Sequence, residues 1–171
     1  MNTRDMTTVL PVLLSELANG SPDPRASTYM LNRGDEGLLN SLDRLSASAA
    51  STASGGGAPI AAHVDHLRYG LSLLNRWAAG EPAPWKGADW TVSWRKTVVS
   101  EAEWRVLRDD LRREVDGWIV ALRTPREVDA AQLGWITGSV AHVAYHLGAI
   151  RQIDRATRGP TAEDERRLER S

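Results

Sequence analysis

The chain contains no cysteine, which excludes disulfides, thiolate metal sites and a cysteine nucleophile. This fits a reducing compartment, and we expect a cytoplasmic protein. The chain also has no excess of charge of either sign. It contains 21 Lys and Arg and 22 Asp and Glu, which give a net charge of −1. No overall field draws the chain towards nucleic acid or a membrane surface, and no basic run with interleaved aromatic residues occurs. We therefore expect no nucleic-acid partner.

A long stretch without charge is present, but its composition argues against a membrane span. Residues 130–150 carry no charged side chain and are long enough to cross a bilayer. They also include Gln132, Thr137, Ser139, two histidines and three glycines, which make the segment a poor lipid solute. We expect a buried core helix here and no membrane partner. The N-terminal apolar run lacks a signal-peptide cleavage site and is expected to form the first helix.

The length of 171 residues predicts one domain, with a charged tail over about residues 158–171 that we expect to be flexible. The first helical pattern is "TTVLPVLLSELA", in which Pro11 falls where a first-turn proline is tolerated. Its apolar side is expected to hold Val9, Val12, Leu13 and Leu17. A second piece, "DEGLLNSLDRLSASAAS", is expected to extend this layer or to form a separate short helix, with Leu38, Leu42 and Leu45 at helical spacing.

Three further long helices are predicted from apolar periodicity. The first runs from Pro59 to about Ala79, the next begins after the capping box of Ser100 and Glu103, and the last runs from about Val128 to about Thr157. The expected buried stripes are Ile60, Val64, Leu67, Leu71 and Leu74, then Trp104, Leu107, Leu111, Val115, Trp118 and Leu122, and finally Val140, Val143, Leu147 and Ile150.

The segment over residues 81–99 carries three tryptophans but no period. We interpret it as a long crossover between the second and third long helices, and long ordered connections are often functional. No strand alternation of useful length occurs in the sequence. The predicted fold is therefore all-α, a four-helix bundle with one long crossover.

The four histidines of the chain fall into two clusters on apolar helical segments. His63 and His66 lie in "IAAHVDHLRYG", and His142 and His146 lie in "SVAHVAYHLGAIRQ". Side chains three or four residues apart share one helix face, so each pair points in one direction. A single histidine on an apolar face is usually a hydrogen-bonded core residue, but burying several without partners costs about 1–3 kcal/mol for each. A divalent cation removes this cost, so we predict a metal site.

The expected ligand set limits the choice of metal. Three neutral imidazoles without a carboxylate suit Zn, Ni, Fe or Co. Three protein ligands leave a position open for water or substrate, as in catalytic sites. Such an ion lowers the pKa of a bound water to about 7 or deprotonates a bound thiol.

The segments "PIAAHVDHLRYGLSLLNRW" and "SVAHVAYHLGAIRQI" resemble the DinB-like family of small bacterial four-helix proteins. By helix order the resemblance covers most of the chain from Thr8 to Ile153. It implies a three-histidine metal site with two ligands from the last helix, which match His142 and His146. Both His63 and His66 fit the remaining position. His66 is favoured because Leu follows it, as Leu or Ile usually does in the family, and His63 is then an alternative or a supporting contact.

The resemblance also implies an activity. Members of the family include metal-dependent hydrolases and transferases that use low-molecular-weight thiols such as mycothiol or bacillithiol, while others have no known activity. We therefore expect a metal-dependent enzyme acting on a small molecule, either a thiol S-transferase or a hydrolase. The alternative is a non-catalytic metal- or ligand-binding bundle, such as a sensor or dimerisation module. The sequence does not decide between a monomer and a homodimer.

Four aromatic residues near the histidines have competing interpretations. Tyr69 and Tyr145 could orient a ligand, but we expect both to be packing residues. Trp90 and Trp94 in the crossover would either wall the mouth of a pocket or cap the hydrophobic end of the bundle.

Five further residues each have a functional and a structural interpretation. Arg68 and Arg151 could bind an anionic cofactor or substrate, but solvated surface positions are the better default. Gly134 and Gly138 are expected to allow close helix approach. Ser139 lacks the surroundings of a nucleophile, and we expect no catalytic role for it.

Overall fold

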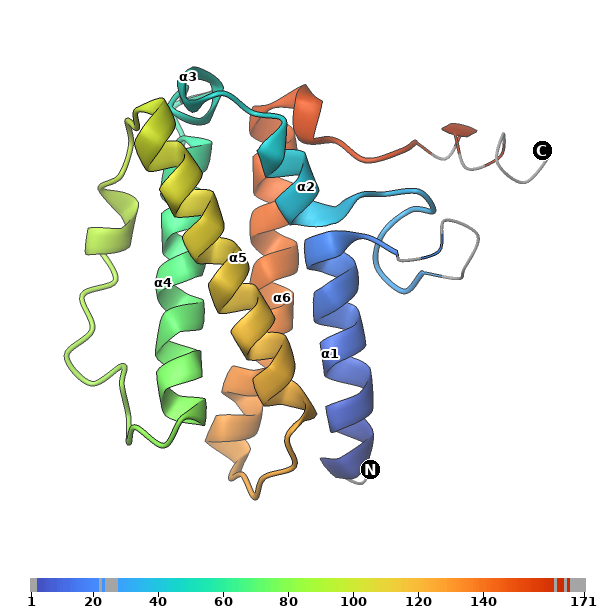
Figure 1. Ribbon diagram of the computed structural model, residues 1–171, viewed down its shortest axis with the longest axis vertical. Helices are drawn as coiled ribbons and strands as arrows, with labels where there is room; N and C mark the ends of the chain where they lie inside the picture. Colours follow the sequence, from blue (N-terminus) through green and yellow to red (C-terminus); the bar gives the residue numbers. More distant parts are fainter. Residues whose placement is uncertain (1–2, 22, 24–27, 162, 165, 167–171) are drawn as a thin grey trace.

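The computed structural model describes residues 3–21, 23, 28–161, 163, 164 and 166. All regular elements in this part of the chain are helical (Figure 1). They are α1 (Thr3–Asn19), α2 (Gly37–Asp43), α3 (Ala47–Ala50), α4 (Ile60–Ala78), the 3₁₀ turn η1 (Val92–Trp94), α5 (Glu101–Arg123), α6 (Ala130–Ile153) and the 3₁₀ turn η2 (Arg155–Thr157).

The four long helices form a bundle around one apolar core. Helix α4 packs against α5 and α6, and α1 packs against the same two helices from the other side (Figure 1). The core includes the fully buried rings of Trp104 and Trp118. The crossover between α4 and α5 runs along the outer side of α4 and contacts it through η1. This arrangement places α4, α6 and the crossover side by side.

Helix α1 differs from its prediction in start and in orientation. It begins at Thr3, so Pro11 lies inside the helix and not in its first turn. Val9 and Val12, predicted to be buried, are each 49% exposed. The helix is rotated by about one residue, so its core face consists of Leu14, Leu17 and Ala18, with Leu10 and Leu13 partly buried against them.

The other helical predictions agree more closely with the structure. The segment after α1 forms two separate short helices, and Leu38, Leu42 and Leu45 are buried. The predicted stripes of α4, α5 and α6 all face the core, with Leu74 only partly buried. The capping box of Ser100 and Glu103 is present.

Helix α6 is shorter than predicted at its C-terminal end. It stops at Ile153 because Asp154 adopts an extended conformation, and the chain then turns into η2. At its start Asp129 and Gln132 form a second capping box, which was not predicted. None of the described helices is both long and apolar enough to span a membrane. Of the charged tail, residues 162, 165 and 167–171 lie outside the described residues.

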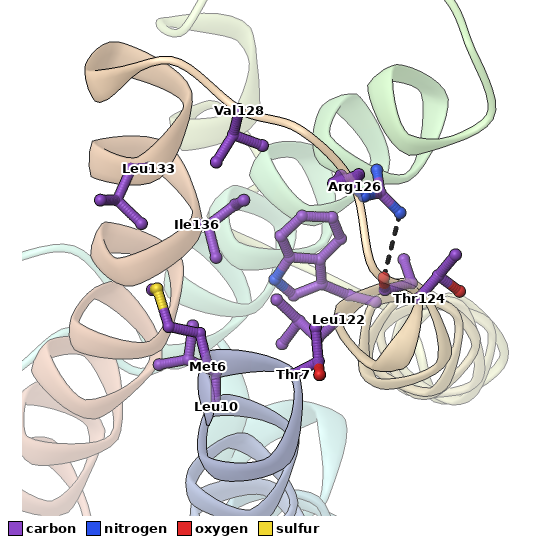
Figure 2. A pocket seen from close by; sticks show the side chains of 11 residues that line it. Met6, Thr7, Leu10, Leu122, Thr124, Arg126, Val128, Leu133 and Ile136 are labelled. Atoms are coloured by element: carbon purple, nitrogen blue, oxygen red, sulfur yellow. Dashed lines mark hydrogen bonds between the residues drawn. The ribbon is translucent and has the colours of Figure 1, made fainter. Parts of the chain in front are cut away.

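A small cavity of about 40 Å³ lies at the end of the bundle where α6 begins. Figure 2 shows its mostly apolar lining, which comes from α1, α5, α6 and the connection between α5 and α6, and includes Met6, Leu122 and Leu133. Arg126 also belongs to the lining, and its guanidinium donates to the carbonyl oxygen of Ala121 at 3.0 Å. No histidine lines this cavity among the residues described, so it is separate from the candidate site.

Candidate metal centre

The packing of α4 against α6 brings all four histidines together. His63 and His66 come from α4, and His142 and His146 come from α6. His146 is 1% exposed and the two histidines of α4 are 9% exposed, while His142 is half-buried. The two clusters lie about 75 residues apart in the chain, and the bundle makes them one site.

Three of the rings form a compact trio. One ring nitrogen each from His66, His142 and His146 lie within 4.8 Å of one another, so these residues could hold a metal ion. The Nε2 atoms of His142 and His146 are 3.0 Å apart, as expected for residues one helical turn apart. The ring of His66 is centred 5.1 Å from that of His142 and 5.2 Å from that of His146.

The hydroxyl of Ser93 fixes the proton on His66. Ser93, in the crossover, is 2% exposed, and its Oγ lies 3.0 Å from the carbonyl oxygen of Trp90 and 3.0 Å from Nδ1 of His66. The single hydroxyl proton goes to the carbonyl, so Oγ must accept a hydrogen bond from Nδ1–H. The neutral His66 ring therefore has an unprotonated Nε2. Ser93 was not predicted, because it lies in a segment without periodicity.

His63 lies behind His146 and outside the trio. The Nδ1 atoms of the two rings are 2.9 Å apart, so one of them donates its proton to the other. His63 also contacts the ring of Trp94 edge-on, at 5.2 Å between ring centres. Its position is that of a supporting contact to His146.

The environment keeps the imidazoles neutral. Burial, together with the neighbouring rings of His142 and His63, lowers the pKa of His66 to about 4, and the carboxylate of Asp65 opposes this shift only in part. Burial and the other three rings lower the pKa of His146 to about 3. Burial also lowers the pKa of His63 and of His142. At neutral pH these rings are therefore uncharged. This neutral form of imidazole is the one that binds metal ions.

The crossover tryptophans cover this centre. Trp94 stacks on the His66 ring with 4.4 Å between ring centres, and Trp90 is 6.0 Å from the same ring. Trp90 is 43% exposed. Trp90 also lines an adjoining cavity, as the first interpretation predicts, whereas Trp94 contacts the histidines and is not part of that lining.

An apolar cavity of about 410 Å³ adjoins the centre between α4, α6 and the crossover. Its lining includes His142, and the tryptophans Trp85, Trp90 and Trp135 form much of its wall. We call it the apolar cavity.

The prediction for Gly134 and Gly138 was wrong. Both glycines line the apolar cavity, and a Cβ atom added at either one would meet no atom within 4 Å. They do not allow close helix approach, because at this level α6 faces open space.

The arginines near the site are engaged by carboxylates. Arg151 donates to both oxygens of Asp35 at 2.7 and 2.8 Å, and the Asp35 side chain is 3% exposed. This pair corrects the expectation of a solvated surface position for Arg151. Arg68 donates to Asp65 at 2.8 Å and is partly buried. Both guanidinium groups already have anionic partners.

Three more predictions can be compared with the structure. Tyr69 packs edge-on against Trp90 as expected, with 5.5 Å between ring centres. Tyr145 is 68% exposed, so its assignment as a packing residue was wrong, although its ring meets that of His146 at 5.2 Å. The Ser139 hydroxyl donates to the carbonyl of Ile136 at 2.6 Å and accepts from the Trp118 indole at 2.8 Å, in agreement with a structural role.

Fold and site together define a protein whose described part is all-helical and carries a largely buried histidine trio that could hold a metal ion. No protein-family model, curated protein or solved structure matches the chain. The resemblance to the DinB-like family therefore stays a prediction.

Proposed function

We propose that the protein is a metal-dependent enzyme of the DinB-like type, with His66, His142 and His146 as the ligands of a divalent transition metal ion. The observation that carries this proposal is the trio of ring nitrogens within 4.8 Å of one another. The donor set fits such an ion, because all three imidazoles are neutral and Ser93 leaves Nε2 of His66 free to coordinate. Zn, Ni and Fe suit three imidazole ligands.

Hydrogen bonds behind the ligands orient them. Ser93 accepts from Nδ1 of His66, and Nδ1 of His63 contacts Nδ1 of His146. Such outer contacts set the tautomer and direction of metal-binding histidines and are nearly as important as the ligands themselves. The tautomer of His146 that donates from Nδ1 to His63 leaves its Nε2, 3.0 Å from Nε2 of His142, with a lone pair that an ion could accept.

The reaction proposed is the transfer or hydrolysis of a group on a small molecule. When bound, the ion would supply Lewis acidity and lower the pKa of a water or thiol in the remaining coordination position. Trp94 shields one face of His66 from solvent. Because the chain has no cysteine, a thiol would have to come from a cofactor, of which mycothiol and bacillithiol are the candidates that the resemblance implies.

Metal analysis of the purified protein tests the metal site. We expect about one transition-metal ion per chain for the wild type and well under one for His142→Ala, while Tyr145→Ala, on the same helix, should keep the ion. Spectra of the Co²⁺-substituted protein should show the absorption of a four-coordinate centre. Metal content well below one per chain in the wild type, unchanged in His142→Ala, would contradict the proposal.

Activity assays separate the enzyme from its alternative. Turnover of thiol and electrophile pairs, or of simple esters and amides, should require both the metal and His142. A stoichiometric ion without any turnover would favour the non-catalytic alternative, a metal-binding sensor or dimerisation module.

A further inference from the structure

The apolar cavity carries an inference about the substrate, which rests on the metal centre proposed above. Its volume of about 410 Å³ falls in the usual range for small-molecule sites, roughly 300–1,000 Å³. His142 belongs both to the cavity wall and to the histidine trio. A molecule in the cavity can therefore contact a residue of the metal centre.

Two exposed glycines of α6 line the cavity, and we call this part of the lining its floor. Gly134 and Gly138 lie one turn apart on α6, and neither would bring a Cβ within 4 Å of another atom. Glycine inside a helix costs about 1 kcal/mol relative to alanine. In this structure helix packing does not offset the cost, because no neighbouring helix uses the space. A ligand in the cavity would fill this space.

The lining limits the chemistry of that occupant. None of the described residues that line the cavity is charged. Ser139 already donates to Ile136 and accepts from Trp118, so its hydroxyl is engaged. Apart from the indole N–H groups, this leaves His142 as the side chain that can meet a polar group of a ligand. A charged molecule would lose its hydration here without gaining a counter-charge.

The walls favour an aromatic occupant. Trp85 and Trp135 meet with 3.9 Å between ring centres, and Trp90 rests on α4 beside Gly70, where an added Cβ would lie 3.7 Å from its ring. Indole rings contribute large apolar contact areas and prefer to pair with other rings. The cavity thus has aromatic walls, an apolar floor and one polar end.

We propose that the apolar cavity binds an uncharged aromatic group of the substrate and directs the substrate's reacting polar atom to the metal centre at His142. This names the substrate class as a neutral, ring-containing small molecule with a polar function at one end.

Binding of two probes to the metal-loaded protein tests this assignment. Imidazole can occupy the open coordination position alone, whereas 4-phenylimidazole adds an uncharged ring. Burying that ring in the cavity should make 4-phenylimidazole bind about 10- to 100-fold more tightly, as the burial of an apolar side chain of this size suggests. Binding can be followed by Co²⁺ absorption and by tryptophan fluorescence.

Substitutions in the floor provide the matched variants. Gly138→Leu should abolish the advantage of 4-phenylimidazole and leave imidazole binding unchanged, while Gly148→Leu, at an exposed position of the same helix, should leave both unchanged. Gly138→Ala fills less space, so it should reduce the advantage only in part. Because its added methyl meets no atom, this variant should also fold at least as well as the wild type.

The outcomes separate this inference from the proposed function. Metal-loaded protein that binds imidazole but gains nothing from the phenyl ring, or a Gly138→Leu variant that keeps the full gain, would overturn the cavity assignment alone. If the protein binds no metal, the proposed function fails first. A neutral aromatic alcohol such as benzyl alcohol should then still quench the cavity tryptophans in wild type but not in Gly138→Leu, and equal responses would overturn the assignment.

Discussion

Replacing Ser93 with alanine removes the hydroxyl that fixes the proton of His66. In the native protein Ser93 donates to the carbonyl of Trp90 and accepts from Nδ1–H of His66, both at 3.0 Å. Without it, Nδ1–H has lost its acceptor, and the ring is free to carry its proton on Nε2. That tautomer cannot coordinate an ion through Nε2, so we expect weaker metal binding.

Two magnitudes follow from this geometry. Loss of a hydrogen-bond partner behind a metal ligand typically reduces metal affinity about 10- to 100-fold. The substitution leaves the Nδ1–H donor of the buried His66 without its acceptor, and an unpaired buried donor costs about 1–3 kcal/mol in the free energy of unfolding. Water cannot easily replace the lost hydroxyl, because Ser93 is 2% exposed. Some loss of stability should therefore accompany the loss of affinity.

Ser139→Ala provides the control. Ser139 is 6% exposed and its hydroxyl also makes two hydrogen bonds, to Ile136 and Trp118, away from the trio. The two variants should lose similar stability in urea denaturation of the metal-free protein. Competition with a chelating dye at neutral pH should show weaker Zn²⁺ binding for Ser93→Ala only.

The reasoning would be refuted by either of two results. Ser93→Ala could bind Zn²⁺ as tightly as the wild type, which would show that the hydroxyl does not set the tautomer. Alternatively, Ser139→Ala could lose as much affinity as Ser93→Ala, and the effect would then reflect general loosening of the fold.

Two further predictions concern stability. The pKa of His66 is lowered from 6.5 to about 4 and that of His146 from 6.5 to about 3 in the folded protein. Below pH 6.5 the unfolded chain therefore binds protons at these two rings that the folded chain does not bind. Stability is therefore full above this pH and lost as the pH falls, by about 2 kcal/mol for each ring at pH 5, or about 4 kcal/mol in total. Urea denaturation of the metal-free protein at pH 8 and pH 5 measures this, and His146→Gln should show a smaller fall; equal values at both pH values would contradict it. Arg151→Met leaves the buried carboxylate of Asp35 without its cation, at a cost of about 3 kcal/mol by the same assay. The double variant with Asp35→Leu should recover part of this loss, and a cost below about 1 kcal/mol would show that the pair is unimportant.

The success of the helix predictions depended on how many apolar faces each segment offers. In α5, the large apolar residues from Trp104 to Leu122 fall on one face, and the opposite face is mostly charged apart from the exposed Val106 and Val120, so one orientation buries the stripe. Helix α1 has apolar residues on adjacent faces, and both Val9 with Val12 and Leu10 with Leu14 form plausible stripes. Packing against α5 and α6 decides between them, and that contact is not encoded in a local pattern.

The candidate site was predictable only where spacing carries the information. Histidines three or four residues apart on apolar helices indicated the trio, because helical geometry fixes their common direction. Ser93 could not be found, since the path of an irregular crossover determines which side chain reaches His66. The glycine pair was misread for a related reason: a spacing of four suits both a helix contact and an open cavity floor, and the facing element decides between them.

The contact of Ser93 with Trp90 gives the main chain control over an imidazole proton. The group that accepts the hydroxyl is a backbone carbonyl, which every residue possesses, so exchanging the indole at position 90 would alter a wall of the cavity but keep the acceptor. Inserting or deleting one residue between positions 90 and 93 would instead shift that carbonyl away from the hydroxyl. The length of this short turn, more than the identity of its side chains, thus determines which nitrogen of His66 is free.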